Sequence, residues 1–380
     1  MKNLQKYTDF FAAGIKADKR GLLGVEVEHF IVDYVSGLTL PYSGGVEDIL
    51  NEISHFYDQK IYSEKHLIAL RRAHMLISLE PAGQLEVSIG EFFELERIEK
   101  EYNSFLSEIS KPLEKRGLKL VTKGYHPLSK AKDMPLLPKE RYRLMDKYFA
   151  TSGQLGLYMM RGTAAVHATV DYFSEKDFVD KFFVANLLTP FLVHLTDNVS
   201  TFEGKKYNKR MLRHKIWTDV DRQRCGVVEG VNSFLDYAKF VCSNLEIVAA
   251  ADNEIEHALS MVFPYVRLKG FIEIRAADSM PIDYVMGYLA LIKGIFYQQE
   301  AIDTIIKQFK NVTASDIFAA FDSLTKYGYN AEAYELSAYP LYFYFFKLAA
   351  NVLKGEELQY LKKLKMLVLK RKTMRQVVKA

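Results

Sequence analysis

A chain of 380 residues has enough material for one large domain or two modest ones, which excludes a small scaffold that depends on disulfides. Hydrophobic residues make up 49% of the sequence and charged residues 26%, so neither extensive disorder nor a fibrous repeat fits it. The net charge is +4, but residues 362–380 hold eight basic residues and no acid, which leaves −4 for residues 1–361. A slightly acidic body is not typical of nucleic-acid-binding proteins, so we expect no nucleic-acid partner.

Cysteine usage and hydropathy predict the compartment. Cys225 and Cys242 are too few for a disulfide framework and form no Cys-x-x-Cys motif, which favours a reducing compartment. Charges interrupt every apolar run of the first 20 residues, and no later segment offers the roughly 20 uninterrupted apolar residues of a membrane span. We therefore expect a cytoplasmic protein without a membrane span, acting as a monomer or a homodimer.

The first part of the chain alternates between helical and extended hydrophobic patterns. The expected elements are, in order, a helix in 1–20, a strand in 24–33, a helix in 46–56, two extended segments in 74–90 broken at Pro81-Ala82-Gly83, a helix in 92–116, a short strand in 118–127 and a helix in 137–149.

The second part ends in helices. The expected elements are a strand in 156–172 with a glycine-containing start, a helix in 175–200 interrupted near Pro190, a polar functional loop in 204–226, a strand in 270–281 and helices over most of 282–380. With no internal repeat or Pro/Ser-rich linker, residues 1–380 are predicted to form a single α+β domain with an antiparallel sheet and external helices.

Four of the expected strands carry polar side chains on one face and apolar side chains on the other. Side chains alternate along a strand, so Glu26 and Glu28 share a face while Val25, Val27, His29 and Ile31 occupy the opposite one. The other polar sets are Gln84, Glu86 and Ser88; His167, Thr169 and Asp171; and Glu273 with Arg275. If these faces line one cavity, that cavity is strongly acidic.

Carboxylates grouped in this way raise one another's pKa unless a cation neutralises them. Oxygen ligands with a single imidazole favour Mg²⁺ or Mn²⁺, and Mg²⁺ commonly bridges carboxylates and nucleotide phosphates, which points to ATP. The sequence has neither GxxxxGK[ST] nor GxGxxG, so metals and arginines would have to hold the nucleotide. The alternative is a sheet whose polar face is merely solvated.

Six segments in order resemble the glutamate–cysteine ligase family of the plant and proteobacterial type. They are GVEVE from residue 24, LEPAGQLEVS from 79, PKERYRLMDKY from 138, MMRGTAAVHATVDY from 159, RHKIWTDVDRQRCG from 213 and FIEIRAADSMP from 271. At a greater distance, some of them are similar to glutamine synthetase. The resemblance implies a curved antiparallel sheet forming a funnel, with metals at its narrow part.

The same resemblance implies an ATP-dependent ligation. ATP would phosphorylate the γ-carboxylate of L-glutamate, and the amine of L-cysteine would attack this γ-glutamyl phosphate to give γ-glutamylcysteine, the first step of glutathione biosynthesis. Such a reaction needs mainly positioning and charge neutralisation.

Site residues follow from the resemblance, motif by motif. The implied metal ligands are Glu26, Glu28, Glu80, Glu86, His167 and Glu273, of which His167 and Glu273 join Glu26 near the ATP phosphates. Arg275 would meet the transferring phosphoryl group, with Glu273 beside it as the second catalytic residue. The implied substrate contacts are Gln84, Arg161, Arg213, Trp217 and Arg224, of which Arg224 and Arg213 would hold the α-carboxylate of glutamate.

Two positions depart from the family pattern and leave alternatives open. Ala82 stands where glycine is more usual and His167 where many plant-type members have glutamine. A ligase using a different amine, or a non-catalytic scaffold that binds ATP and metal, is therefore also compatible with the sequence.

The basic C-terminal segment, at about 356–380, also has two interpretations. Its apolar residues Leu361, Leu364, Val368 and Met374 fit a helix docked on the core, with its basic residues in water. The alternative is an amphipathic helix for a membrane surface or an acidic partner.

Overall fold

The computed structural model describes residues 4–244, 246–249 and 254–378. Its centre is a nine-stranded sheet with the order β12-β13-β7-β1-β5-β4-β3-β2, in which β6 also pairs with β1 and all pairs are antiparallel. The strands are β1 (Leu23–Asp33), β2 (Gln59–Ser63), β3 (His66–Arg72), β4 (Met75–Leu79), β5 (Leu85–Phe92), β6 (Leu118–Val121), β7 (Ala165–Val170), β12 (Val266–Leu268) and β13 (Ile272–Asp278). The α+β class and the antiparallel sheet are confirmed, whereas β2 and β3 had not been predicted.

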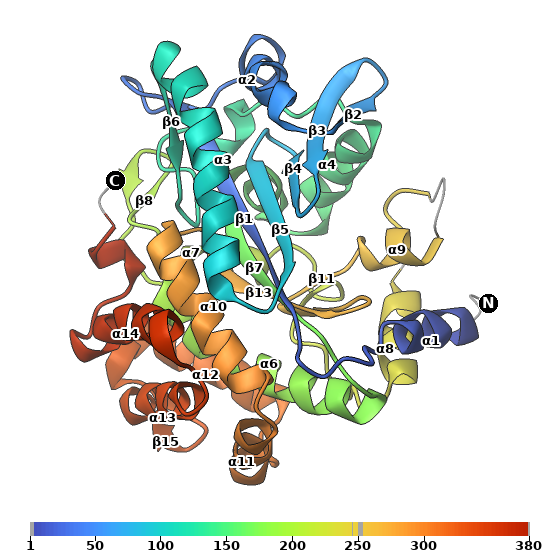
Figure 1. Ribbon diagram of the computed structural model, residues 1–380, viewed down its shortest axis with the longest axis vertical. Coiled ribbons are helices and arrows are strands. Elements are labelled where there is room, and N and C mark those ends of the chain that lie inside the picture. Colours follow the sequence, from blue (N-terminus) through green and yellow to red (C-terminus); the bar gives the residue numbers. More distant parts are fainter. Residues whose placement is uncertain (1–3, 245, 250–253, 379–380) are drawn as a thin grey trace.

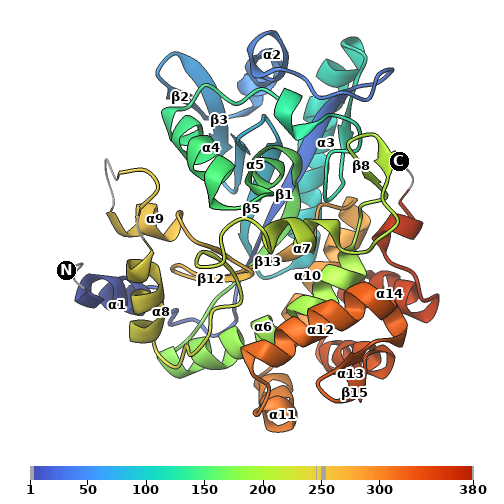
Figure 2. The ribbon, with the colours of Figure 1, turned by 180° about the vertical axis from the view of Figure 1, so that it is seen from behind.

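The helices surround this sheet (Figures 1 and 2). They are α1 (Leu4–Ala13), α2 (Glu47–Ile53), α3 (Leu95–Lys115), α4 (Glu140–Ser152), α5 (Gly156–Gly162), α6 (Glu175–Thr196), α7 (Leu212–Trp217), α8 (Phe234–Ser243), α9 (Glu254–Leu259), α10 (Ile282–Phe296), α11 (Gln299–Phe309), α12 (Ala314–Tyr327), α13 (Ala338–Ala350) and α14 (Gly355–Leu369). Three two-stranded ribbons complete the fold: β8 (Thr201–Phe202) with β9 (Lys205–Lys206), β10 (Cys225–Gly226) with β11 (Phe263–Pro264), and β14 (Glu332–Ala333) with β15 (Leu336–Ser337).

Strand β1 is the longest strand of the sheet, and its partner on one side changes along its length. Leu23–Val27 pair with β7, whereas Phe30–Asp33 pair with β6. Glu28 lies between these two ladders, and its Oε2 accepts a hydrogen bond from the backbone N–H of Ala165 at 2.8 Å. A side chain thus occupies the point where the sheet divides.

The two faces of the sheet have the chemistry that strand alternation predicted. Val25 and Val27 are buried, and His29 beside them contacts the hydroxyl of Tyr102 on α3 through Nε2 at 2.6 Å. Helix α3 crosses this apolar face in Figure 1, whereas Figure 2 shows α4, α5 and α7 over the opposite face. The polar side chains of Glu26 and Glu28 therefore lie under α4, α5 and α7.

Helix α6 runs without a break through Pro190, contrary to the predicted interruption. A proline has no N–H to donate to the carbonyl four residues earlier, here that of Asn186. The hydroxyl of Thr189 donates to this carbonyl at 2.7 Å and so supplies the missing hydrogen bond. The helix is long and apolar enough to cross a membrane by length and composition, but 83% of its most apolar window is buried inside the protein.

Two further predictions about elements are corrected. The segment expected as a strand from 156 begins as helix α5, and the strand starts only at Ala165, because Met159 and Met160 pack into the core from a helix. The segment expected as a loop contains α7, whose Leu212 and Ile216 are buried four residues apart on one helical face. Its many charges had hidden this spacing.

The C-terminal helix is shorter than predicted. Helix α14 ends at Leu369 and a 3₁₀ turn follows at Met374–Gln376, while residues 379–380 lie outside the described residues. The apolar residues named for docking, Leu361, Leu364, Val368 and Met374, are all buried. The segment therefore docks on the core, as the first of its two interpretations stated.

Candidate active site

A cavity of about 400 Å³ lies over the polar face of the sheet. Strands β1, β5, β7, β12 and β13 form its floor, and α4, α5 and α7 contribute to its walls. Four carboxylates line it, those of Glu26, Glu28, Glu80 and Glu86, together with His167. The prediction that separate strands bring these side chains to one cavity is confirmed.

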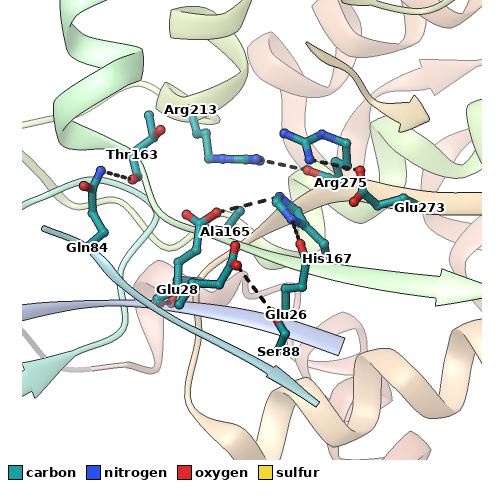
Figure 3. A network of polar contacts seen from close by, with 12 residues as sticks. Glu26, Glu28, Gln84, Ser88, Thr163, Ala165, His167, Arg213, Glu273 and Arg275 are labelled. Atoms are coloured by element: carbon teal, nitrogen blue, oxygen red, sulfur yellow. Dashed lines mark hydrogen bonds and ion pairs between the residues drawn. The ribbon is translucent and has the colours of Figure 1, made fainter. Parts of the chain in front are cut away.

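Three of these residues lie close enough together to share one cation. Ligand atoms of Glu26, Glu86 and His167 all lie within 4.8 Å of one another. Pairing of the strands places them there, because Glu26 is directly opposite His167 on β7, and Glu86 on β5 is directly opposite Glu28. Figure 3 shows Glu26, Glu28 and His167 pointing toward one another.

His167 is held in a form suited to a metal ligand. Burial and the positive charge of Arg275 lower its pKa to about 4, so the ring is neutral near pH 7. Its Nδ1 lies 2.7 Å from Oε2 of Glu26, and a neutral ring donates to a carboxylate from this atom. The lone pair of Nε2 is then available, and this buried atom has no hydrogen-bond partner among the described residues.

The remaining carboxylates repel one another. Burial, followed by the charge of Glu80, raises the pKa of Glu28 to about 8. Burial and the charges of Glu26, Glu80 and Glu28 raise the pKa of Glu86 well above its ordinary value. Burial also raises the pKa of Glu26, but the hydrogen bond with His167 and the positive charge of Lys269 act together against it, so the net pKa is lowered.

This set of donors fits a divalent cation. Carboxylate oxygens of the partly buried Glu26 and Glu86, with one buried neutral imidazole nitrogen that has no hydrogen-bond partner among the described residues, match the ligand types of Mg²⁺ or Mn²⁺. A bound cation would replace the protons that mutual repulsion otherwise favours on Glu28 and Glu86.

Basic side chains form the other side of the cavity. Glu273 is fully buried and accepts from Arg267 at 2.7 Å, Lys269 at 2.7 Å and Arg275 at 3.0 Å. Burial opposes ionisation, but the charges of Arg267, Lys269 and Arg275 outweigh it and hold the pKa of Glu273 well below its usual range. Glu273 is therefore ionised and orients three cations beside the acid cluster.

The predicted acidity of the cavity is corrected by these cations. Four carboxylates line the cavity, but so do six basic residues. These are Lys139, Arg141, Arg213, Arg267, Lys269 and Arg275. Sequence reasoning missed four of them, Lys139, Arg141, Arg267 and Lys269. Arg267 and Lys269 carry a usable signal, since Arg267 lies opposite Glu273 on the paired strand β12 and Lys269 follows the end of that strand directly.

Helix α7 brings Arg213 and Trp217 to the cavity, as predicted for both. The Nη1 and Nη2 atoms of Arg213 donate to the carbonyls of Ala276 and Arg275 at 3.2 and 3.0 Å. Its Nε and the Nε1 of Trp217 are buried and have no hydrogen-bond partner in the described part of the chain. Such donors are suited to a ligand's carboxylate or phosphate oxygens.

Two other residues predicted as substrate contacts have ionic partners within the protein. Arg161 pairs with Asp146 at 2.6 Å, and Arg224 pairs with Asp221 at 3.1 Å; neither lines the cavity. Both guanidinium groups hold neighbouring segments together, and a contact of Arg161 or Arg224 with substrate stays a prediction.

Gln84 lines the cavity, but its amide is used by the backbone. It accepts from the N–H of Ala82 at 2.8 Å and donates to the carbonyl of Thr163 at 3.1 Å. Gln84 therefore positions β5 against the start of β7.

The thiol of Cys225 favours its protonated form, which is a weak nucleophile. Burial raises the pKa of its thiol to about 12, so it stays protonated at neutral pH.

Comparisons with known proteins identify the family of this chain. The family model described as "Glutamate-cysteine ligase family 2(GCS2)" matches residues 22–335. A chloroplastic glutamate–cysteine ligase of Nicotiana tabacum is 29% identical over 341 residues, which cover 81% of this chain and 65% of the relative. Glutamate–cysteine ligase A, chloroplastic, of Oryza sativa subsp. indica is 30% identical over 330 residues, covering 78% of this chain and 67% of the relative. This chain thus spans about two thirds of the length of these relatives.

Solved structures share the fold. A glutamate–cysteine ligase from Francisella tularensis, determined in complex with AMP, superposes with a TM-score of 0.63 at 10% identity and covers 94% of this chain and 84% of its own. A bifunctional glutathione synthetase from Pasteurella multocida gives a TM-score of 0.51 at 13% identity, covering 99% of this chain and 50% of its own. The match of the family model over most of the chain shows that this protein belongs to glutamate–cysteine ligase family 2.

Proposed function

We propose that the protein is an ATP-dependent ligase that joins the γ-carboxylate of L-glutamate to the amine of L-cysteine through a γ-glutamyl phosphate. Family membership supports this proposal, and one observation carries it: an acid cluster and a basic cluster face each other in one cavity. Such an arrangement suits phosphoryl transfer from a metal–nucleotide complex to a carboxylate.

In this proposal Glu26, Glu86 and His167 would hold Mg²⁺ or Mn²⁺, with Glu28 and Glu80 beside them. When bound, the cation neutralises phosphate oxygens that would otherwise be repelled by the carboxylates. Glu273, also proposed from the sequence as a ligand, is engaged by three cations in the structure, so we assign it to orienting them.

The basic side of the cavity would bind the anions. Arg275, which Glu273 holds by an ion pair, would meet the transferring phosphoryl group, and Arg267 and Lys269 would add positive charge on the same side. Arg213 and Trp217 offer buried N–H groups to the α-carboxylate of glutamate or to phosphate. Lys139 and Arg141 line the wall formed by α4 and its N-terminal end, where a further anionic group could be held.

The experiment is ADP release by the purified protein with ATP, Mg²⁺ and L-glutamate, measured with and without L-cysteine, followed by mass spectrometry of the product. We expect ADP formation that depends on cysteine and a product with the mass of γ-glutamylcysteine. A panel of other amines in the same assay tests the amine assignment. A preferred amine other than cysteine would replace the acceptor, and no ADP release with any amine would overturn the ligase proposal.

A further inference from the structure

A second cavity, of about 450 Å³, shares no lining residue with the active-site cavity. It lies between the chain just before α7, the turn after α12 and the basic C-terminal segment. Three arginines line it, Arg210, Arg371 and Arg375, and none of the described residues that line it has a carboxyl group. The C-terminal segment lies beside β8 in both views of the fold (Figures 1 and 2).

Backbone carbonyls hold two of these arginines in place. Nη1 of Arg210 donates to the carbonyls of Thr325 and Lys326 at 3.2 and 3.1 Å. Arg375 donates to the carbonyls of Lys209 and Tyr207. A carbonyl oxygen satisfies a donor and fixes its direction but carries no net charge, so the positive charge of the guanidinium is not neutralised.

Carboxylates compensate little of this charge. The buried Asp197 has one oxygen 3.6 Å from Nη1 of Arg375. In the described part of the chain, no carboxylate forms an ion pair with Arg210 or Arg371; Arg371 donates instead to the side-chain oxygen of Asn330 at 2.8 Å and lies over the ring of Tyr339. Three guanidinium groups therefore face one carboxylate, which leaves the cavity positively charged.

Gly328 opens room for Arg210 at the cavity wall. Its φ of 59° and ψ of −130° lie in a region that only glycine adopts readily. A Cβ at this position would lie 3.1 Å from Nε and 3.2 Å from Cζ of Arg210. The guanidinium thus lies directly against the backbone of Gly328.

His194 lies in the cavity close enough to Arg210 to be affected by its positive charge. It lines the cavity from α6 and is 1% exposed. Burial, followed by the positive charge of Arg210, lowers its pKa to about 3, so the ring stays neutral. The charge of the cavity therefore comes from the arginines alone.

We propose that this cavity binds a small molecule carrying at least two negative charges, whose phosphate or carboxylate groups pair with Arg210 and Arg371. Guanidinium groups bind both kinds of anion through paired N–H groups, and the cavity is large enough for a metabolite. The arginines of the C-terminal segment thereby gain a role in ligand binding, separate from the docking of α14 and independent of the proposed ligase activity.

The test is isothermal titration of the full chain with pyrophosphate and, separately, with citrate, in a buffer freed of divalent cations by a chelating resin, at constant ionic strength set by sodium chloride. The two probes distinguish a phosphate from a carboxylate ligand. The variants are Arg371→Gln and Arg210→Gln, with Lys372→Gln as the matched control, since this neighbouring exposed lysine does not line the cavity. Lys269→Gln reports on binding in the active-site cavity.

We expect at least one probe to bind the wild type, and Arg371→Gln and Arg210→Gln each to weaken binding about tenfold or more. Lys372→Gln and Lys269→Gln should retain an affinity within about twofold of the wild type. Melting curves check that each variant is folded. If Arg210→Gln does not fold, the result for Arg371→Gln alone decides the proposal. Equal weakening by Arg371→Gln and Lys372→Gln would assign binding to diffuse surface charge, as for a membrane or an acidic macromolecule, and would overturn the proposal. Loss of binding in Lys269→Gln only, or no binding by either probe, would overturn it as well.

Discussion

Glu26 and His167 lie directly opposite each other on neighbouring antiparallel strands, and their side chains are joined at 2.7 Å between Oε2 and Nδ1. The contact fixes the orientation of the ring and directs Nε2 to the acid cluster. A carboxylate in this position also makes the imidazole a better electron donor.

We predict that His167→Ala weakens Mn²⁺ binding at least tenfold, because it removes one ligand atom and frees the side chain of Glu26. Titration of the protein with Mn²⁺, followed by electron paramagnetic resonance of the free ion, measures the affinity. His55→Ala, which removes an exposed histidine from another part of the fold, should leave the affinity unchanged. Equal Mn²⁺ affinity in wild type and His167→Ala would exclude His167 as a ligand.

A second prediction concerns the buried carboxylate of Glu273. Glu273→Gln should lower the free energy of unfolding by about 3–5 kcal/mol, because three cations lose a partner that no solvent replaces. Urea denaturation measures the change. Glu140→Gln is the matched control, since it breaks an exposed pair with Arg143 and should change the free energy of unfolding far less. Similar losses in the two variants would contradict the prediction.

The third prediction concerns acid stability. Burial, followed by the charge of Lys215, lowers the pKa of His214 from 6.5 to about 3. Between these values the unfolded chain binds a proton that the folded chain does not, so the free energy of unfolding decreases as the pH falls from 6.5. His214→Phe can still stack on Phe321, whose ring centroid lies 4.1 Å away, but does not titrate.

The slope of unfolding free energy against pH, from urea curves between about pH 4 and 6, should therefore be smaller in His214→Phe by up to about 1.4 kcal/mol per pH unit. Other buried groups titrate in both proteins and cancel in the difference. An unchanged or steeper slope in the variant would rule out a neutral buried His214.

The fourth prediction concerns the continuous helix α6. Thr189→Val keeps the shape of the side chain but removes the hydroxyl that serves the carbonyl of Asn186. We expect a loss of about 1–3 kcal/mol in the free energy of unfolding, the cost of leaving a buried carbonyl without a partner. Thr151→Val, at an exposed position on α4 where the hydroxyl donates to the carbonyl of Tyr148, is the control and should cost less.

Much of the sheet was predictable because its strands alternate. The period of two in β1, β5, β7 and β13 separates a face that packs on helices from a face that holds the acids. Successive side chains of a strand must point to opposite faces of the sheet, so the sequence alone assigns each residue to a face. The acid cluster follows from this local pattern together with the resemblance. The prediction did not need the order of the strands.

The rest of the site depends on contacts that no local pattern encodes. Lys139 and Arg141 reach the cavity because α4 folds over the sheet, and Arg161 is withdrawn from it because Asp146 is on the adjoining helix. Likewise, Pro190 correctly predicts the loss of one backbone hydrogen bond of the helix. Only the structure shows that the hydroxyl of Thr189 donates to the carbonyl left without a partner.

The change of partner along β1 has a further consequence for how the cavity arises. Where β7 and β6 diverge, the N–H of Ala165 is served by the carboxylate of Glu28, and the hydroxyl of Ser279 donates to the carbonyl of Glu28 at 2.5 Å. Glu28 thus connects three chain segments at the fork. The other oxygen of its carboxylate, Oε1, lies 3.9 Å from Nε2 of His167. The fork in the sheet and the acid cluster of the cavity therefore share one residue, so the strands cannot diverge at another point without moving a candidate ligand.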